Sequence, residues 1–203
     1  MTRLAIVAGG LFALLTALVA ADATTGIDDE WNEAMIDTEV GWLVDIAQAV
    51  SWVGSTTLAI ITAVVIAAVF AFRRRLWDAA ALVAIAVAAF VVSQVVKVAV
   101  DRQRPPNPVD LETSGSYPSA SVMVSATAIA LGAAVLASRH GSRRRTALLA
   151  VAVGYVVLMA WSRTYLRAHW LTDVAGGAAG GLAIVAAGIA LLAVVNRRAG
   201  ALR

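Results

Sequence analysis

Long apolar segments constrain this chain more than any other feature of its sequence. Six of them approach or exceed the ~18 largely apolar residues that suggest a transmembrane helix. They run roughly over Leu4–Ala21, Ser51–Phe72, Trp77–Val100, Ser119–Ser138, Ala147–Trp161 and Val174–Val195. Each segment must be helical, because an open strand in lipid would leave backbone groups without hydrogen-bond partners. The sequence therefore predicts an all-α fold, in which residues 1–203 form one membrane domain, a bundle of six transmembrane helices.

The charged residues divide between the two sides of this predicted bundle. One side receives one anion, Asp78, and eleven cations, which are Arg3, Arg73, Arg74, Arg75, Arg139, Arg143, Arg144, Arg145, Arg197, Arg198 and Arg203. The other side receives five cations and twelve acids, so the two sides carry +10 and −7. Because short arginine-rich loops stay in the cytoplasm, both termini are predicted to be cytoplasmic. The basic balance of the chain then reflects membrane topology and gives no reason to expect a nucleic-acid partner.

Two segments near the N-terminus allow more than one interpretation. Leu4–Ala21 follows Arg3 and ends in small residues, so it could be a cleaved signal peptide. Its apolar run is long for a signal, and we favour a retained helix. Asp28–Ala49 mixes acids with apolar residues at spacings of three and four. That pattern fits an amphipathic helix lying in the membrane interface, or a solvated connector with an aromatic anchor.

Three cations on the predicted extracytoplasmic side belong to polar motifs at the ends of the apolar segments. Lys97 and Arg104 lie in KVAVDRQRPP, and Arg163 lies in the loop SRTYLRAHWLTD. Cations at one membrane depth repel one another unless an anion lies between them. Phosphate is the natural candidate, because Arg binds its oxygens in a bidentate manner and Lys adds a point charge. Ser119, in YPSAS, is a candidate N-cap of the next helix, and the free amides of a helix start also bind anions.

The spacing of His169 and Asp173 suggests a nucleophile. If the sixth helix begins near His169, the two side chains lie on one helical face. Asp173 can then accept the proton of one ring nitrogen, which leaves the other nitrogen free to attack. Simpler interpretations exist for single residues: Lys97 could pair with Asp101, and a lone histidine is often only interfacial. Because charges at a membrane edge are usually functional, we favour the combined site.

Other features of the sequence receive a structural interpretation. Arg102 and Arg167 match no motif position and are interpreted as flanking charges. GGAAGG, at residues 176–181, could form a dimer face, but we favour tight packing of the sixth helix inside the monomer. The chain has no cysteine, so thiol chemistry and cysteine-based metal sites are excluded.

These spacings resemble the type 2 phosphatidic acid phosphatase superfamily. Its signature is Lys, six residues, Arg-Pro; then Pro-Ser-Gly-His; then Ser-Arg, five residues, His, three residues, Asp. The first part is complete as Lys97, Arg104 and Pro105, and the third is complete as Ser162, Arg163, His169 and Asp173. The second part is altered, since Ala120 stands for Gly and Ser121 for His. The matching residues lie between Lys97 and Asp173.

The resemblance implies a role for each matching residue. Lys97, Arg104, Ser119 and Arg163 would bind the phosphoryl group, with Ala120 beside it. His169 would form a phosphohistidine, Asp173 would orient the ring, and the histidine replaced by Ser121 would protonate the leaving oxygen. Such enzymes use no metal or other cofactor.

Ser121 cannot act as a general acid near neutral pH as a histidine can. Three explanations stay open. The chain could be an inactive engineered form, it could act on a lipid diphosphate whose leaving group needs little protonation, or it could bind a phospholipid headgroup without turnover.

The expected function is that of an integral membrane phosphohydrolase. Its substrate would be a lipid phosphate or diphosphate, such as a polyprenyl diphosphate or a phosphatidate-like lipid. The site would face outward from a bacterial inner membrane. The alternative is a non-catalytic lipid-phosphate-binding protein or a transporter of the same fold. The lipid, the oligomeric state and native activity are not readable from these residues.

Overall fold

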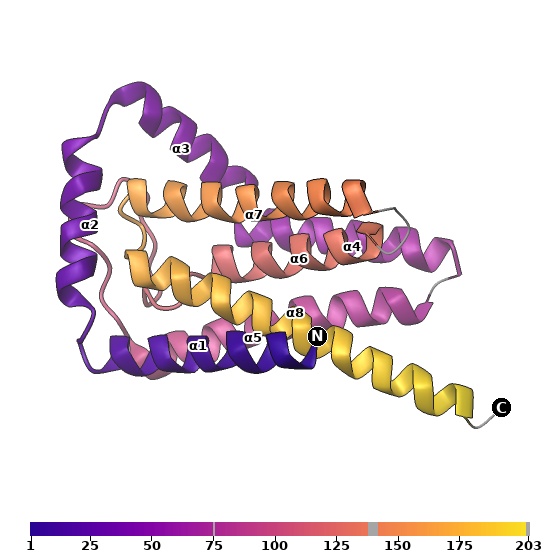
Figure 1. The fold of residues 1–203 in the computed structure, drawn as a ribbon. Helices are drawn as coiled ribbons and strands as arrows, with labels where there is room; N and C mark the ends of the chain where they lie inside the picture. Colours follow the sequence, from indigo (N-terminus) through magenta and orange to yellow (C-terminus); the bar gives the residue numbers. More distant parts are fainter. Residues whose placement is uncertain (75, 138–141, 202–203) are drawn as a thin grey trace.

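Eight helices make up the part of the chain that the computed structural model describes, which is residues 1–74, 76–137 and 142–201 (Figure 1). Their bounds are α1 Thr2–Ala20, α2 Thr25–Asp37, α3 Gly41–Val53, α4 Thr56–Phe72, α5 Leu76–Val100, α6 Ala120–Ala137, α7 Ser142–Tyr165 and α8 Leu171–Ala201. The fold is all-helical over the described residues, as the apolar segments predict. Arg75, Arg139 and Arg203 of the predicted basic side lie outside them.

Four of these helices are long and apolar enough to cross a membrane by length and composition: α1, α5, α7 and α8. The pair formed by α3 and α4, which bend by 41° at the break between them, would make a fifth span. The sixth predicted span corresponds to α6, whose apolar stretch Ala120–Ala130 is shorter than a span. The protein is thus a multi-pass membrane protein, and a count of six spans stays a prediction.

The segment between the first two predicted spans differs from the expectation. The helix predicted over Asp28–Ala49 is two helices, α2 and α3, and the span predicted from Ser51 begins as α4 at Thr56. At the first break the Tyr165 hydroxyl donates to the Thr38 carbonyl at 2.9 Å and accepts from the Val40 amide at 3.0 Å. Tyr165 therefore supplies the partners that the interrupted helix lacks.

Close contacts explain the second break, between α3 and α4. A Cβ at Gly54 would lie 1.9 Å from the Met159 sulfur of α7, so the chain passes α7 at a distance that only glycine permits. Ser55 then caps α4, since its hydroxyl accepts from the Leu58 amide at 3.3 Å. Hydropathy alone shows neither contact, which is why the sequence predicted one continuous span here.

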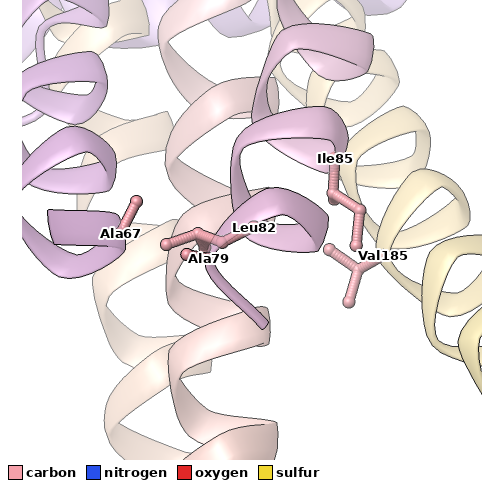
Figure 2. Close-up of a cluster of buried hydrophobic side chains, with 5 residues drawn as sticks. All are labelled: Ala67, Ala79, Leu82, Ile85 and Val185. Carbon is pink, nitrogen blue, oxygen red and sulfur yellow. The ribbon is translucent and has the colours of Figure 1, made fainter. Parts of the chain in front are cut away.

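Apolar side chains of α4, α5 and α8 pack together inside the bundle. Figure 2 shows one cluster of buried residues, formed by Ala67 of α4, by Ala79, Leu82 and Ile85 of α5, and by Val185 of α8. In a membrane such packing replaces the hydrophobic effect as the main attraction between helices.

The glycine-rich start of α8 packs inside the monomer. A Cβ at Gly177 would lie 2.6 Å from the Ser119 carbonyl, and one at Gly181 would lie 2.6 Å from the Met123 carbonyl of α6. On the other side α1 packs against α8, and Thr16 of α1 lies within 3.0 Å of the Tyr117 hydroxyl. These contacts support the internal interpretation of GGAAGG, and they place α1 against α8 within the bundle.

The two ends of the bundle differ in what they carry (Figure 1). At one end, α2 lies across the helix ends, together with the loops that join α5 to α6 and α7 to α8. The N-terminus lies at the end of α1 that points away from α2, and the C-terminus lies at the far end of α8. The described basic residues Arg3, Arg73, Arg74, Arg143 and Arg144 are exposed at these remote helix ends. All the motif residues lie at the α2 end.

Candidate active site

A cavity of about 630 Å³ lies at the α2 end of the bundle. Five residues singled out from the sequence line it: Lys97, Ala120, Ser121, Arg163 and His169. Arg104 and Asp173 do not line it but contact the lining residues Glu112 and His169, and Ser119 directly precedes the lining residue Ala120. The structure therefore brings together residues from three motifs that are up to 76 positions apart in the sequence.

Lys97 lies in the last turn of α5 and is 4% exposed. Its ammonium group donates to the backbone carbonyls of Gly115 and of Ser116, the latter at 3.5 Å. Among the described residues it forms no ion pair with Asp101, so the simpler interpretation of Lys97 as one half of that pair is wrong. The loop that precedes α6 holds the ammonium group at the cavity wall.

Arg163 belongs to a helix and not to the predicted loop, because α7 continues to Tyr165. Its guanidinium donates to the Ser51 hydroxyl at 2.6 Å, to Asp110 at 2.9 Å and to Glu112. The side chain is 3% exposed, and its Nε is buried with no hydrogen-bond partner among the residues that the structure describes. A helix fixes the direction of this arginine more firmly than a loop would.

Arg104 lies in the loop after α5 and also contacts Glu112. Its Nη2 donates to Glu112 at 2.8 Å, and its Nη1 donates at 2.5 Å to the carbonyl of Ala168, the residue before His169. The Glu112 carboxylate thus lies between the guanidiniums of Arg104 and Arg163.

The acids Asp110 and Glu112 are site residues that the sequence analysis missed. Burial would raise the pKa of the Glu112 carboxyl, but the surrounding cations, Arg163 foremost, lower it below its usual range. Cations at one membrane depth need an anion between them, and in this structure Glu112 of the α5–α6 loop is that anion. The sequence does contain a signal for these two acids, because they lie on the same predicted side of the membrane as the cations.

His169 is buried at the cavity, with 2% of its surface exposed. It precedes α8, which begins at Leu171, so the expectation that His169 and Asp173 share a helical face is wrong. The physical reason is a cap: the Asp173 carboxylate accepts from the Trp170 amide at 2.8 Å, which places the helix start after Trp170. The His169 amide donates instead to the carbonyl of Arg163, at 3.2 Å.

The His169 ring is placed to stay neutral. Its Nδ1 lies 3.4 Å from Asp173 Oδ2, although the geometry is not that of a hydrogen bond. Burial, aided by nearby Arg163 and Arg104, lowers the pKa of the imidazole to about 4, although Asp173 acts in the opposite direction. Near neutral pH the ring therefore retains a nitrogen lone pair, which a nucleophile requires.

Asp173 is fully buried and accepts hydrogen bonds on both oxygens. Oδ2 accepts from the Trp170 amide and from the Ser116 hydroxyl, and Oδ1 accepts from Arg102 at 2.7 Å. The interpretation of Arg102 as a flanking charge is wrong, since it is a direct partner of this carboxylate. Arg167 is a loop anchor that pairs with Glu39 and donates to the Asn107 carbonyl at 2.7 Å.

The start of α6 forms another part of the wall. Ser119 directly precedes α6, as the N-cap interpretation predicts, and its amide donates to the Asp173 carbonyl at 3.0 Å. Its hydroxyl is 3.5 Å from the Val122 amide, at the limit of a hydrogen bond. Ser121 faces the cavity, and its hydroxyl lies 3.5 Å from that of Thr56. No titratable group on α6 faces the leaving-group position assigned to Ser121, as far as the described side chains show.

The fold and the site together define a class of protein: a multi-pass helical bundle with a buried, neutral histidine among lysine and arginine at one end. The sequence profile of the PAP2 superfamily matches residues 75–198, and the chain belongs to this superfamily.

Two relatives cover most of the chain. Phosphatidylglycerophosphatase B of Bacillus subtilis (strain 168) is 27% identical over 174 residues, which are 84% of this chain and 86% of that protein. The crystal structure of a transmembrane PAP2-type phosphatidylglycerolphosphate phosphatase from Bacillus subtilis matches with a TM-score of 0.85 and 25% identity. That match covers 93% of this chain and 95% of the other.

A third protein shares the fold. The crystal structure of Aquifex aeolicus LpxE matches with a TM-score of 0.55 and 17% identity, over 80% of this chain and 94% of that one. These likenesses support the family resemblance that the motifs between Lys97 and Asp173 indicate.

Proposed function

We propose that this protein is a membrane lipid phosphatase that works through a phosphohistidine at His169. The observation that carries the proposal is a buried, neutral imidazole at the wall of a cavity that Lys97 and Arg163 also line. A neutral ring can attack phosphorus, and the cations can stabilise the charge on the phosphoryl oxygens in the transition state. Membership of the PAP2 superfamily and the phosphatase names of the relatives support the same conclusion.

Each motif residue has a role in this proposal. Lys97, Arg104 and Arg163 bind the phosphoryl oxygens, and amides at the start of α6, after Ser119, add further donors. The free nitrogen of His169 forms a bond to phosphorus while the bond from phosphorus to the lipid oxygen breaks. A water molecule then attacks the phosphohistidine, which releases phosphate and returns the ring nitrogen.

Asp173 orients the ring and stabilises the positive imidazole during the reaction. The 3.4 Å gap between Nδ1 and Oδ2 must shorten for this role. Such shortening is expected, since catalytic hydrogen bonds are often long until the substrate is bound.

The proposed substrate is a glycerolipid phosphate of the phosphatidylglycerophosphate kind, with a polyprenyl diphosphate as the second candidate. The first follows from the names of the two Bacillus relatives. The shape of the cavity also suits a lipid, because its lining continues from Lys97 along α5 to Gln94 and Phe90. Phe90 lies seven positions before Lys97 in α5, about 10 Å along the helix axis, so the cavity reaches from the charged end toward the apolar part of α5.

The proposed location is a bacterial inner membrane, with six spans, both termini in the cytoplasm and the site facing outward. The separation of charge between the two ends of the bundle supports this orientation. A headgroup would then be cleaved at the outer surface while the lipid tails stay in the bilayer.

A non-catalytic lipid-phosphate binder is the second candidate, and Ser121 is the observation that favours it. If Ser121 and Ala120 replace the family's His and Gly, the leaving-group acid is absent. A transporter is less favoured, because charge deep in the bundle is expected there, and the described charged side chains of the bundle lie near the helix ends.

Phosphate release from lipid phosphates tests the proposal. Purified protein in mixed micelles should release phosphate from phosphatidylglycerophosphate or from a lipid diphosphate, and His169→Ala should abolish the release. Binding of a lipid phosphate without release by the unsubstituted protein would favour the binder, and unchanged release by His169→Ala would exclude the phosphohistidine.

A further inference from the structure

Arg102 joins two buried carboxylates beside the start of α8. Its Nη1 donates to Asp173 at 2.7 Å, and its Nη2 donates to Asp28 at 2.6 Å. The side chains of Asp28 and Asp173 are 1% and 0% exposed, and that of Arg102 is 14% exposed. Burying three charges is costly unless each has a partner, so the three are energetically dependent on one another.

Asp28 reaches this cluster from α2, 144 positions before Thr172. One of its oxygens accepts from the Thr172 amide at 2.9 Å, and the other accepts from the Thr172 hydroxyl at 2.7 Å. That amide is among those that a helix start leaves without an intrahelical partner. The positive end of the α8 dipole also favours carboxylates at this place. Asp28 therefore holds both Arg102 and the first turn of α8.

The bonds to Asp173 fix which of its oxygens faces His169. Arg102 occupies Oδ1, whereas the Trp170 amide and the Ser116 hydroxyl occupy Oδ2, the oxygen 3.4 Å from the His169 ring. Without Arg102 the carboxylate would lose the partner of Oδ1, one of the three groups that fix its rotation. It would also lose the cation that keeps a fully buried carboxylate ionised.

We propose that Arg102 and Asp28 are positioning residues, which hold Asp173 in the orientation and ionised state that it needs to align His169. Neither residue touches the cavity, so both act through Asp173. This inference rests on the proposed function, because it assigns His169 as the reacting group. It also gives α2 a role in the site that no motif residue of the sequence indicates.

A purely structural role is the competing explanation, since the same bonds fasten α2 to α8. The two explanations differ in what they change. A positioning role changes kcat more than KM, because the substrate-binding cations stay in place. It also changes the titration of His169, whose charged neighbours are Asp173, Arg163, Arg104 and Glu112. If the bonds only hold α2 against α8, their loss lowers the melting temperature and leaves kcat of the folded protein unchanged.

The test compares Arg102→Gln with Arg102→Lys and with Arg167→Gln, all as full-length protein in detergent. Arg167 is the matched control, because it is an arginine two positions before His169 that pairs with Glu39 and does not contact Asp173. The measurements are kcat and KM for the lipid phosphate, the melting temperature, and the histidine titration by NMR. The chain has only two histidines, so the His169 signal is assignable from the His169→Ala spectrum.

We expect Arg102→Gln to lower kcat by about 10²-fold with little change in KM, as misplacement of a reacting group does. The His169 titration should move to lower pH, because without Arg102 the buried Asp173 carboxyl takes up a proton and no longer stabilises the positive ring. Arg102→Lys should recover part of both effects, and Arg167→Gln should show neither. A kcat loss shared equally by Arg167→Gln, or a His169 titration unchanged in Arg102→Gln, would overturn the proposal.

A second variant covers the case in which Arg102→Gln does not fold. The double variant Arg102→Gln with Asp28→Asn removes one charge of each sign, and it should show the same kcat loss and the same direction of titration. Unperturbed values in the double variant would also overturn the proposal. If the unsubstituted protein releases no phosphate, the proposed function fails, and the titration still decides whether Arg102 controls His169.

Discussion

At the residue scale, Glu112 occupies the place between two arginines that a phosphoryl group would otherwise take. Arg104 and Arg163 both contact its carboxylate, so their mutual repulsion is relieved without any ligand. A phosphoryl group that binds these arginines must compete with Glu112 or displace it. The side chain is one-third exposed and comes from a loop, so displacement requires no change in the helices.

Glu112→Gln is therefore expected to strengthen anion binding. Loss of a partly exposed ion pair of about 1 kcal/mol corresponds to a few-fold change in affinity, so the inhibition constant of orthovanadate should fall on the order of threefold to tenfold. Competition against lipid-phosphate hydrolysis, or vanadate binding where turnover is absent, measures this. Glu33→Gln, on the exposed surface of α2, is the matched control. Weaker binding in Glu112→Gln would mean that Glu112 orders the arginines rather than competing with the ligand.

Ser121 raises a second question at this scale, because it lines the cavity with its hydroxyl 3.5 Å from that of Thr56. Introducing a general acid there, as Ser121→His, should raise monoester hydrolysis by about 10²–10⁴-fold. A lipid diphosphate should gain much less, since its leaving group departs more readily without a proton. The comparison of kcat/KM for the two substrates measures the difference, with Ala120→Gly added if the methyl group crowds the phosphate. Equal gains for both substrates would refute the leaving-group argument.

At the element scale, the start of α8 depends on close packing against α6. Gly177 approaches the Ser119 carbonyl, and the Ser119 amide in turn donates to the Asp173 carbonyl. The close approach of Gly177 to Ser119 therefore also fixes the position of the start of α6 along the bundle axis, relative to the residues that follow His169. Glycine is required here for its size, because the helix leaves no room for a Cβ.

Gly177→Ala should consequently destabilise the protein by about 1–3 kcal/mol, as overpacking does. It should lower kcat as well, because the start of α8 must move away from Ser119. Gly154→Ala is the matched control, since Gly154 lies in helix α7 with nothing within 4 Å of an added Cβ. Thermal melting in detergent and kcat for both variants make the comparison. A Gly177→Ala protein as stable and active as Gly154→Ala would show that α8 can shift freely.

At the scale of the whole molecule, the position of the site depends on which end of the bundle faces outward. The motif residues and the acid-rich α2 lie at one end, and the exposed arginines lie at the other. A membrane with cytoplasmic arginines would place the cavity on the outer surface.

Cysteine labelling in intact cells tests this orientation, and the chain helps because it has no cysteine of its own. Single cysteines at Glu33 and at Thr113 should react with an impermeant thiol reagent, whereas one at Ser142 should react only after the cells are opened. All three positions are exposed; Asn32, beside Glu33, is buried and would be a poor choice. Labelling of Ser142 alone in intact cells would reverse the proposed topology.

The sequence alone was enough for the parts of this protein that local pattern controls. Apolar length predicts the helices because lipid permits few other backbone structures, and the predicted starts of α5 and α6 lie within one residue of those observed. Motif spacing also selects Lys97, Arg104, Arg163, His169 and Asp173 as candidate site residues, and the structure places all five in or beside one cavity.

Other parts follow only from tertiary contacts between distant segments. The Asp28–Arg102–Asp173 cluster, the place of Glu112 between two arginines, and the break between α3 and α4 at Met159 all join residues that no local pattern relates. Arg102 matches no motif position, and its partners lie 74 and 71 positions away. Packing of the whole bundle brings Asp28, Arg102 and Asp173 into one buried cluster, and burial makes each of them depend on the others.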